Sequence, residues 1–453
     1  MARHTDTIAA LATPAGTSAL ATIRISGPDT KRLAGEIFGS VPPARVATHG
    51  DFADRSGLVV DDVVATLFAG PHSYTGEDSL EISCHGSPFI ARKILADLLS
   101  RGCRPAGPGE FTQRAFLNGR MDLSQAEAVM DLINARSERA LAAARQVLRG
   151  ALSRHMAELV DGLLGTLAMV EAYIDFPDED LPPEDRSRLE ERVSAVLRRT
   201  QLLLATERTG ALLREGIRTV ILGEPNAGKS SLLNRIVGSE RAIVSSEPGT
   251  TRDFIEERVT VGPHGLRLVD TAGLNPDARG IEMLGVEKTL ENAAGADLFL
   301  LVLDSTRPTP PLPPALRERI NPSNTLVVLN KADLLADRNH PTAVPPGGFP
   351  AVAVCSLSGD GFDTLLTEIE RLAEGLQTTV GDERIAINVR HAHYLAEARV
   401  CIEDALAKIA GRAPAELLAS DLRGALGALG EISGKVDNER MLDQLFASFC
   451  IGK

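Results

Sequence analysis

Residues 223–230 read GEPNAGKS, and this short segment restricts the possible folds strongly. It matches the pattern G-x-x-x-x-G-K-[ST], in which backbone N–H groups surround phosphates, the lysine reaches the terminal phosphates and the hydroxyl ligates Mg²⁺. The motif requires a strand before it and a helix after it. The apolar run 219–222 and the helical SSLLN that follows the motif meet this requirement, so we predict an α/β domain with phosphate-binding residues at Lys229 and Ser230.

Two further motifs follow in the order typical of guanine-nucleotide hydrolases. DTAG at 270–273 ends an apolar run, where Asp270 can support the Mg²⁺ shell and the Gly273 amide can sense the γ-phosphate. In NKAD at 330–333, the carboxylate of Asp333 can accept from the ring N–H and the exocyclic amine of guanine, a donor pair that adenine lacks. Either motif alone is an ordinary turn or capped loop. Together with the phosphate loop they predict GTP, and Ser356 lies where a base-contacting loop is expected, in only a partial match.

Hydrophobic patterning predicts a multidomain chain with α/β, α+β and all-α parts. At about 150 residues per domain, 453 residues suggest three domains. Residues 1–118 mix short β-rich runs with Gly/Pro turns and predict an N-terminal α+β domain. Helical spacing from Leu123 stops at 175–180, resumes near Arg186 until about Gly210, and returns after Gly381. We therefore expect a helical domain in two segments, 119–214 and 379–453, around an inserted Ras-like P-loop domain at 215–378, with strands at 219–222, 266–270, 298–304, 325–330 and 351–355.

Charge and cysteine content exclude several classes of protein. With 48 basic and 61 acidic residues the net charge is -13, which argues against a whole-surface polyanion binder but allows a local basic groove. The five cysteines are scattered without a C-x-x-C, so no disulfide framework or zinc site is indicated. Pro14 and Gly16 interrupt the N-terminal apolar run, and no stretch reaches about 18 apolar residues. We expect a cytoplasmic protein with no membrane span.

Several longer segments carry a family resemblance. They are PGTTRD at 248–253, SYTGEDSLEISCHG at 73–86, PGEFTQRAFLNGRMDLSQAEAVMDLI at 108–133, IDFPDED at 174–180 and CIGK at 450–453. Together they resemble the MnmE (TrmE) family of tRNA-modification GTPases, within the TrmE-Era-like superfamily, over nearly the whole chain.

The resemblance implies an activity, partners and a cofactor. Such a protein is a cytoplasmic homodimer that, in a heterotetramer or larger complex with the flavoprotein MnmG, adds an aminomethyl-type (carboxymethylaminomethyl) group at carbon five of the wobble uridine in certain tRNAs. Its N-terminal domain forms the dimer and binds 5-formyltetrahydrofolate or a related one-carbon tetrahydrofolate. The corresponding folate positions are Arg24, Glu81, Arg120 and Lys453. A carboxylate there can accept pterin N–H groups, and the cations can face anionic or carbonyl oxygens.

Two details of the N-terminal and C-terminal motifs stay open. Residues 16–19 read GTSA where the family usually has G-R-G-G, so this loop lacks an arginine and two glycines. Cys450 lies next to the folate motif, either as a partly exposed reactive thiol or as a buried structural cysteine.

Leu274 follows DTAG, where many such hydrolases have a glutamine that orients the attacking water. Leucine cannot do this, so the chain is either a slow switch that needs an external activator or it supplies other groups. The resemblance implies the second: paired G domains, a K⁺ held by Asn226 with Ser245, Glu247 and Thr250, Mg²⁺ held by Ser230 and Thr251, and Glu282 orienting water beside the catalytic Lys229. The full set of expected GTP-binding residues is Asn226, Ala227, Gly228, Lys229, Ser230, Ser231, Ser245, Ser246, Glu247, Pro248, Gly249, Thr250, Thr251, Asp270, Thr271, Ala272, Gly273, Asn330, Lys331, Asp333 and Ser356.

Two other functions remain as alternatives. A ribosome-assembly or signalling GTPase switch would be favoured by an RNA-binding appendage rich in Lys and Arg, and none is evident in the sequence. A folate-dependent one-carbon transferase would have no need for an integral GTPase domain.

Overall fold

The computed structural model describes residues 5–175, 183–239, 256–270, 291, 293–335, 342–377, 385–434, 445–447 and 449–452. The chain divides into two compact units, Met1–Met130 with Gly430–Lys453, and Asp131–Leu429. Helices α4 (Leu123–Asn134) and α14 (Ala415–Ser433) each run across the division between these units.

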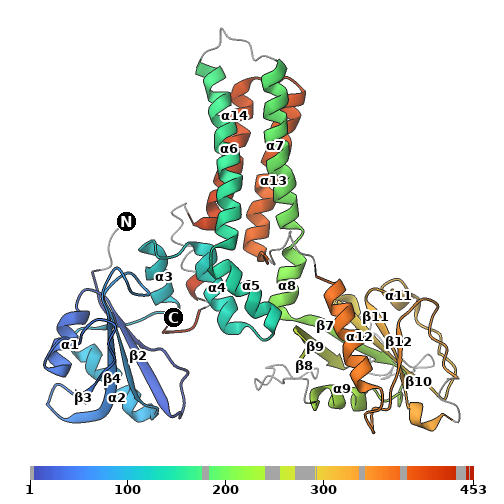
Figure 1. The fold of residues 1–453 in the computed structure, drawn as a ribbon, viewed down its shortest axis with the longest axis horizontal. Helices are drawn as coiled ribbons and strands as arrows, with labels where there is room; N and C mark the ends of the chain where they lie inside the picture. Colours follow the sequence, from blue (N-terminus) through green and yellow to red (C-terminus); the bar gives the residue numbers. More distant parts are fainter. Residues whose placement is uncertain are drawn as a thin grey trace. The chain divides into compact units, whose positions relative to one another are not determined.

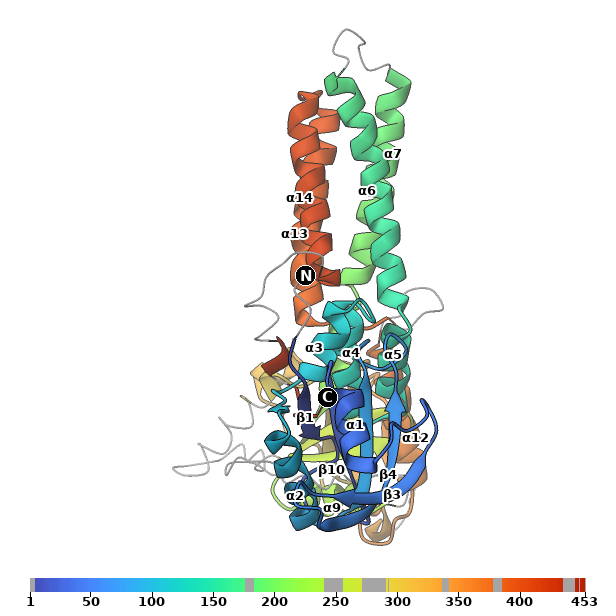
Figure 2. The ribbon, with the colours of Figure 1, turned by 90° about the vertical axis from the view of Figure 1, so that its left-hand side faces the viewer.

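The first unit is built on a six-stranded sheet in the order β3-β4-β5-β2-β1-β6, in which the β1–β6 pair is parallel and the other pairs are antiparallel. Alternate residues of β2 and β5, such as Ile23 and Ile82, are buried against the helices α1 and α2, which both pack on this face (Figure 2). The expected α+β fold is therefore confirmed. Its elements are β1 Ile8–Leu11, β2 Leu20–Ser26, α1 Thr30–Phe38, β3 Thr48–Ala53, β4 Val59–Phe68, β5 Ser79–His85, α2 Pro88–Ser100, β6 Arg104–Pro105 and α3 Glu110–Leu117.

The C-terminal segment returns to this unit. Phe446 and Phe449 are buried against Leu123 at the start of α4. Ile451 forms an antiparallel bridge with Pro108, and the Gly109 N–H donates to the carbonyl oxygen of Cys450 over 3.2 Å. The end of the chain therefore lies beside α3, although several hundred residues separate the two in the sequence.

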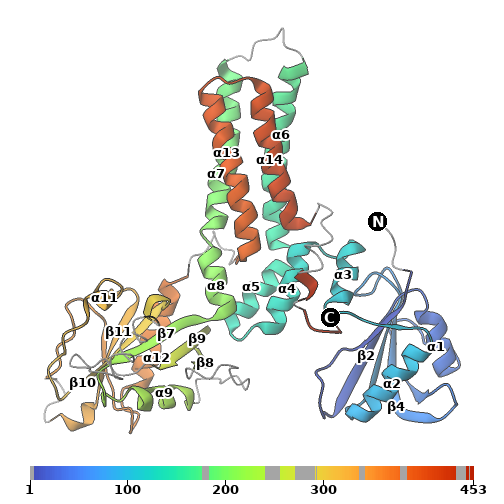
Figure 3. The same cartoon turned by 180° about the vertical axis from the view of Figure 1, so that it is seen from behind.

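Four long helices, α6, α7, α13 and α14, lie side by side in a bundle (Figures 1 and 3). Two of them precede and two follow the second sheet in the chain, and Arg423 of α14 pairs with Glu171 of α6 over 2.7 Å. The apolar spacing predicted from the sequence explains the packing, since Leu152, Met156 and Leu159 are buried on one side of α6. The helices outside the sheet region are α5 Glu138–Leu148, α6 Ala151–Asp175, α7 Pro183–Leu204, α8 Glu207–Glu215, α13 Val389–Ala410 and α14.

The helix bounds differ from the predicted ones by a few residues. Helix α7 begins at Pro183 rather than near Arg186, because proline fits the first helical turn, where its missing N–H has no partner to lose. The predicted end near Gly210 is also wrong, since α8 continues to Glu215 and Gly216, with a φ of 87°, ends it.

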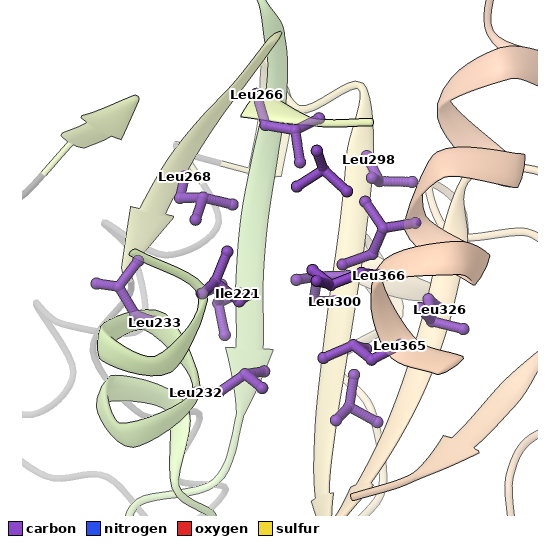
Figure 4. Packing of buried hydrophobic residues seen from close by; sticks show 14 of the residues in the cluster. Ile221, Leu232, Leu233, Leu266, Leu268, Leu298, Leu300, Leu326, Leu365 and Leu366 are labelled. Atoms are coloured by element: carbon purple, nitrogen blue, oxygen red, sulfur yellow. The ribbon is translucent and has the colours of Figure 1, made fainter. Parts of the chain in front are cut away.

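The second sheet has the order β12-β11-β10-β7-β9-β8 and is parallel except for the β8–β9 hairpin. One face is covered by α9 and α12, whose leucines pack against β7, β9, β10 and β11 (Figure 4). The strands of this sheet are β7 Ile217–Gly223, β8 Glu256–Val261, β9 His264–Asp270, β10 Leu298–Asp304, β11 Thr325–Asn330 and β12 Ala351–Ala353, and its helices are α9 Lys229–Val237, α11 Pro314–Arg317, the short 3₁₀ turn η1 Ala332–Leu334 and α12 Phe362–Gly375.

The opposite face of this sheet has its own apolar cluster, with Val220, Leu222 and Phe299 packed against Leu316 of α11. Burial on both faces is typical of a parallel α/β sheet, and the expected inserted P-loop fold is confirmed. The strand predicted at 351–355 ends two residues earlier, where Cys355 begins a turn closed by hydrogen bonds with Gly359 and Asp360. Within the described ranges, none of the helices has the length and apolar character needed to cross a membrane.

Candidate functional site

The phosphate loop joins β7 to α9 at the carboxyl end of the sheet. Gly223 has a φ of 153°, and a Cβ there would lie 2.3 Å from the carbonyl oxygen of Val302. Gly228 has a φ of 95°, and a Cβ there would lie 2.1 Å from Nδ2 of Asn330. Both motif glycines are therefore needed for close backbone approach as well as for their conformation, and they leave the first N–H groups of α9 facing the loop.

Lys229 is buried at the first position of α9. Its Nζ donates hydrogen bonds to the carbonyl oxygens of Gly223 (3.1 Å) and Glu224 (2.9 Å). Burial lowers the pKa of Lys229, and the negative charge of Asp270 opposes this shift. The ammonium group is thus held inside the loop, where a phosphate can replace carbonyl oxygens as its acceptor.

Ser230 and Asp270 form the part of the site suited to a divalent cation. Ser230 Oγ donates to Oδ2 of Asp270 over 2.9 Å. Oδ1 of Asp270 is buried and accepts no hydrogen bond from the described residues. A buried carboxylate oxygen without a donor fits a cation or one of its bound waters, so these two residues suit Mg²⁺.

Asn330, at the end of β11, connects the phosphate loop with the loop at 356–358, which we call the base loop. Its Nδ2 donates to the carbonyl oxygen of Ala227 over 2.8 Å. Its Oδ1 accepts from the backbone N–H of Ser356 (3.1 Å) and from Ser356 Oγ (2.9 Å). The contact between Asn330 and Ser356 could not be predicted from the partial motif match at 356–358.

Lys331 and Asp333 follow in the same motif. Lys331 has a φ of 61° and donates from Nζ to Oδ2 of Asp304 over 2.7 Å. Burial by itself would raise the pKa of Asp304, but hydrogen bonds from Lys331 and Thr306 hold this pKa below its usual value. Asp304 was not predicted as a site residue, and its only signal is its position at the end of a fully apolar strand.

A cavity of about 530 Å³ is lined by the phosphate loop, the NKAD motif and residues 355–357, whereas the predicted residues Ala227 and Asp270 do not line it. This volume lies in the range of about 300–1,000 Å³ typical of small-molecule sites. Asp333 is exposed at the cavity, where a carboxylate can meet a base edge. The predicted residues that line it are Asn226, Gly228, Lys229, Ser230, Ser231, Asn330, Lys331, Asp333 and Ser356.

Arg235 of α9 donates hydrogen bonds to the base loop, and this role was not predicted from the sequence. Its Nη2 donates to the carbonyl oxygen of Ser358 (2.8 Å), its Nη1 to that of Leu357 (3.3 Å), and its guanidinium lies 6.0 Å from the ring centroid of Phe362. The helix that begins at the phosphate loop therefore also holds the base loop.

Some predicted residues lie outside the described residues, and their roles stay predictions. In the GTPase part they are Ser245, Ser246, Glu247, Pro248, Gly249, Thr250, Thr251, Thr271, Ala272, Gly273, Leu274 and Glu282, and at the C-terminus Lys453.

Arg24 and Glu81, two predicted folate positions, are direct neighbours on β2 and β5. Arg24 donates from Nε (3.0 Å) and Nη2 (2.8 Å) to the same oxygen, Oε1 of Glu81. The guanidinium lies over the rings of Tyr74 (5.5 Å) and Phe111 (5.7 Å). Because both bonds use Oε1, Oε2 of the partly exposed Glu81 accepts no hydrogen bond from Arg24 and can accept one from a ligand.

The other folate positions lie near the same segments. Nη1 of Arg24 donates to the carbonyl oxygen of Gly452 over 3.3 Å, so the residue before Lys453 is in contact with the Arg24–Glu81 pair. Arg120 is exposed, and its side-chain stem lies against Gly76, in the loop that also carries Tyr74.

The structure also describes Cys450 and the loop at 16–19, whose sequence differs from the usual family pattern. Ser18 N–H donates to the carbonyl oxygen of Gly86 (3.0 Å), and Gly86 N–H donates to that of Ala19 (3.2 Å). This loop is therefore anchored to the end of β5 without an arginine. Cys450 is exposed, so the alternative of a buried structural cysteine is wrong.

Comparisons with known proteins agree with this arrangement. The family model described as MnmE helical domain matches residues 123–450, and the one described as GTP-binding protein TrmE N-terminus matches residues 7–120. The tRNA modification GTPase MnmE of Opitutus terrae is 58% identical over 448 residues, which is 99% of each chain. Proteins of the same name from Symbiobacterium thermophilum and Chloroflexus aurantiacus are 42% and 43% identical and also cover 99% of this chain.

One solved structure with a partial match is the G domain of the T. maritima FeoB iron transporter. It is 25% identical, covers 36% of this chain and 99% of that one, and has a TM-score of 0.25. A likeness at this level supports no inference about this chain.

Proposed function

The chain belongs to the MnmE (TrmE) family of tRNA modification GTPases, and on this basis we propose that it hydrolyses GTP to drive a modification of the wobble uridine in certain tRNAs. The observation that carries the GTPase part is the side chain of Asn330, which joins the phosphate loop at Ala227 to the base loop at Ser356. A site organised in this way holds the two ends of a nucleotide at a fixed separation.

In this proposal each described side chain has one task. Asp333 accepts two hydrogen bonds from the guanine edge. Lys229 leaves the carbonyl oxygens of Gly223 and Glu224 and donates to the β- and γ-phosphates. Ser230 and Asp270 would hold Mg²⁺, directly or through water, and this ion would supply positive charge beside the phosphate oxygens.

The hydrolytic step needs a group that orients water, because Leu274 cannot. We assign this task to Glu282. The K⁺ that accompanies paired G domains is assigned to Asn226, with Ser245, Glu247 and Thr250. Asn226 supports this because it lines the nucleotide cavity and its side chain offers a carbonyl oxygen, the kind of ligand that can replace the hydration shell of K⁺.

The N-terminal unit is the proposed site of a one-carbon tetrahydrofolate. Glu81 would accept pterin N–H groups at Oε2 while Arg24 keeps Oε1. Arg120 and Lys453 would face the carbonyl and carboxylate oxygens of the ligand. The aromatic rings beside Arg24 fix its guanidinium, so the carboxylate keeps its direction in the absence of ligand.

The modification itself is proposed to involve the flavoprotein MnmG and a dimer of this chain. The product would be a carboxymethylaminomethyl-type group at carbon five of the wobble uridine. In this division of work the chain described here supplies the GTPase cycle and the folate site, and the flavin chemistry belongs to the partner.

Mass spectrometry of tRNA nucleosides tests the proposal. Cells that lack this chain should lose the modified wobble uridine, and the wild-type gene should restore it. Lys229→Ala should fail to restore it because phosphate binding is lost, whereas Arg371→Gln, an exposed change on α12, should restore it fully. Unchanged wobble uridines in the deleted cells, with a defect in ribosomal subunits instead, would favour the ribosome-assembly alternative.

A further inference from the structure

A second cavity, of about 230 Å³, lies within the unit Asp131–Leu429 where α8 meets the β8–β9 hairpin. Four arginines and one carboxylate line it, namely Arg136, Arg214, Arg258, Arg267 and Glu215. This concentration of positive charge contrasts with the net charge of -13 for the whole chain. It matches the local basic groove that the sequence composition allows.

The sheet itself brings arginines together. Arg267 of β9 is the direct partner of Arg258 on β8 and of Arg218 on β7, so three arginines form a row across three strands. Leu266 and Leu268 pack with α9, which places Arg267 on the opposite face. Like charges directly opposite each other destabilise a sheet, and an anion in the cavity would offset the repulsion between Arg258 and Arg267, which both line it.

For Arg214, Arg258 and Arg267, the nearby carboxylates compensate only part of the positive charge. Glu215 lies 3.2 Å from Nη2 of Arg267, which is a hydrogen bond. Glu256 is 3.8 Å from Nε of Arg258 and 4.0 Å from Nη1 of Arg267, which is too long for hydrogen bonding. Asp131 is 3.8 Å from Nη1 of Arg214, whose Nη2 donates to the carbonyl oxygen of Ile387.

The side chain of Arg267 has one hydrogen-bond donor that is not satisfied by the described residues. Its Nε is buried and has no hydrogen-bond partner among the described residues. A buried donor without a partner is unfavourable, so an acceptor that enters the cavity would gain from it. Planar guanidinium groups that converge on one cavity are well suited to a tetrahedral oxyanion, which they can bind through pairs of parallel hydrogen bonds.

The volume of the cavity limits the size of the group that it can bind. A volume of about 230 Å³ is below the range of about 300–1,000 Å³ that holds a whole small molecule. It suits one phosphate group whose substituents continue into solvent, because Arg136 and Arg258 at its lining are exposed. We propose that this cavity binds a backbone phosphate of the RNA substrate, an inference that rests on the proposed tRNA-modifying function.

The position of the cavity gives this contact a consequence for GTP. Strand β9 of the hairpin ends at Asp270, which accepts a hydrogen bond of 2.9 Å from Ser230 of the phosphate loop, so the hairpin that lines this cavity leads to the proposed nucleotide site. Thr260 Oγ1 on the same hairpin donates to the carbonyl oxygen of Arg136 over 3.0 Å. RNA bound here would therefore change GTP affinity, and GTP would change RNA affinity by the same factor.

The test is the affinity of the full-length protein for an unmodified tRNA transcript, measured by fluorescence anisotropy at several salt concentrations. The double variant Arg136→Gln/Arg258→Gln should bind about three- to tenfold more weakly per lost contact at physiological salt, and its plot of log affinity against log salt should be shallower by about one per contact. Arg371→Gln removes the same charge from α12 and should change neither quantity. If the double variant does not fold, Arg136→Gln alone, at an exposed position, decides.

Each other outcome has a defined meaning. Equal tRNA affinity and salt dependence in the wild type and the double variant would overturn the inference and leave the proposed function intact. If the double variant loses binding of inorganic phosphate but keeps the wild-type affinity for tRNA, the cavity binds a free anion and the RNA assignment is overturned. A wild-type protein that binds no tRNA, alone or with its flavoprotein partner, would contradict the proposed function itself.

Discussion

The side-chain amide of Asn330 donates a hydrogen bond of 2.8 Å to the carbonyl oxygen of Ala227, and its oxygen accepts two hydrogen bonds from Ser356. Asn330→Ala would leave these buried groups without partners, each at about 1–3 kcal/mol. We expect GDP and GTP to lose affinity together, by about 10- to 100-fold, because both loops lose their connection. Titration with a fluorescent GDP analogue measures this, and Asn321→Ala, in an exposed turn of the same domain, should leave affinity unchanged.

This connection also shows how far sequence reasoning reaches. The N-K-x-D spacing predicts that Asn330 lies at a nucleotide, but its partners Ala227 and Ser356 are 103 and 26 residues away in the chain. Which atoms meet depends on strand order, because β7, β10 and β11 are consecutive in the sheet although β8 and β9 come between β7 and β10 in the sequence. The Arg24–Glu81 pair is similar, since both residues were predicted separately but their contact depends on the register of β2 and β5.

The strands also differ in how well the sequence predicts them. Those at 298–304 and 325–330 were predicted with the correct bounds because every residue in them is buried, and a continuous apolar run is a strong signal. Strand β8 was missed because it is a half-exposed edge strand whose sequence EERVTV mixes charges with valines. Its pairing with β9 creates the arginine row, which was therefore not predictable.

Substitution of Asp333 tests whether its carboxylate recognises the guanine base. Replacing it with Asn exchanges one carboxylate oxygen for an amide donor, so GTP should bind more weakly and xanthosine triphosphate more tightly. Competition between the two nucleotides in the wild type and Asp333→Asn measures the change. Because Asp333 is exposed, no loss of stability is expected, and an unchanged nucleotide preference would remove Asp333 from the base site.

Glu81 tests the folate site. Purified protein should bind 5-formyltetrahydrofolate, and Glu81→Ala should remove a charge-assisted hydrogen bond of about 1.5–3 kcal/mol, equivalent to roughly ten- to a hundredfold in affinity. Calorimetry with Arg24→Ala and the double variant separates ligand contact from the ion pair, since losses that do not add indicate that the two residues act together. No binding by the wild type would point to the GTSA sequence at 16–19 as the reason.

Glu110 gives a prediction for pH. Burial by itself would raise the pKa of Glu110, but hydrogen bonds from Arg104, the Gly107 amide and Arg114 hold this pKa below its ordinary value of 4.5. The lowered folded-state pKa stabilises the first unit above about pH 4.5, and the stabilisation is lost as the pH falls through that lower pKa.

Glu110→Gln should therefore lower the free energy of unfolding of this unit by about 1–3 kcal/mol at pH 7, and by progressively less as the pH falls through the lowered pKa of Glu110. Hydrogen exchange of the β1 amides reports this unit without interference from the second one. Asp51→Asn, which neutralises an exposed carboxylate on β3 of the same unit, is the matched control and should have little effect at any pH. A pH-independent difference for Glu110→Gln would mean that its charge is not what stabilises the unit.

The sequence DTAGL leads to a prediction about potassium and Glu282. Leu274 can neither orient water nor stabilise developing charge, so turnover should depend on a K⁺ bound at Asn226, whose charge acts strongly once paired G domains exclude water. Sodium is smaller and should fit that site less well. Glu282→Ala should leave GTP affinity nearly unchanged and lower turnover by about 10²–10⁴-fold, the range for a positioned acid or base. The measurement compares turnover and GTP affinity in potassium and in sodium for the wild type, Glu282→Ala and the exposed Glu291→Ala as control. Equal wild-type rates in the two salts, or a Glu282→Ala variant that loses affinity instead of rate, would mean that another group replaces the missing glutamine.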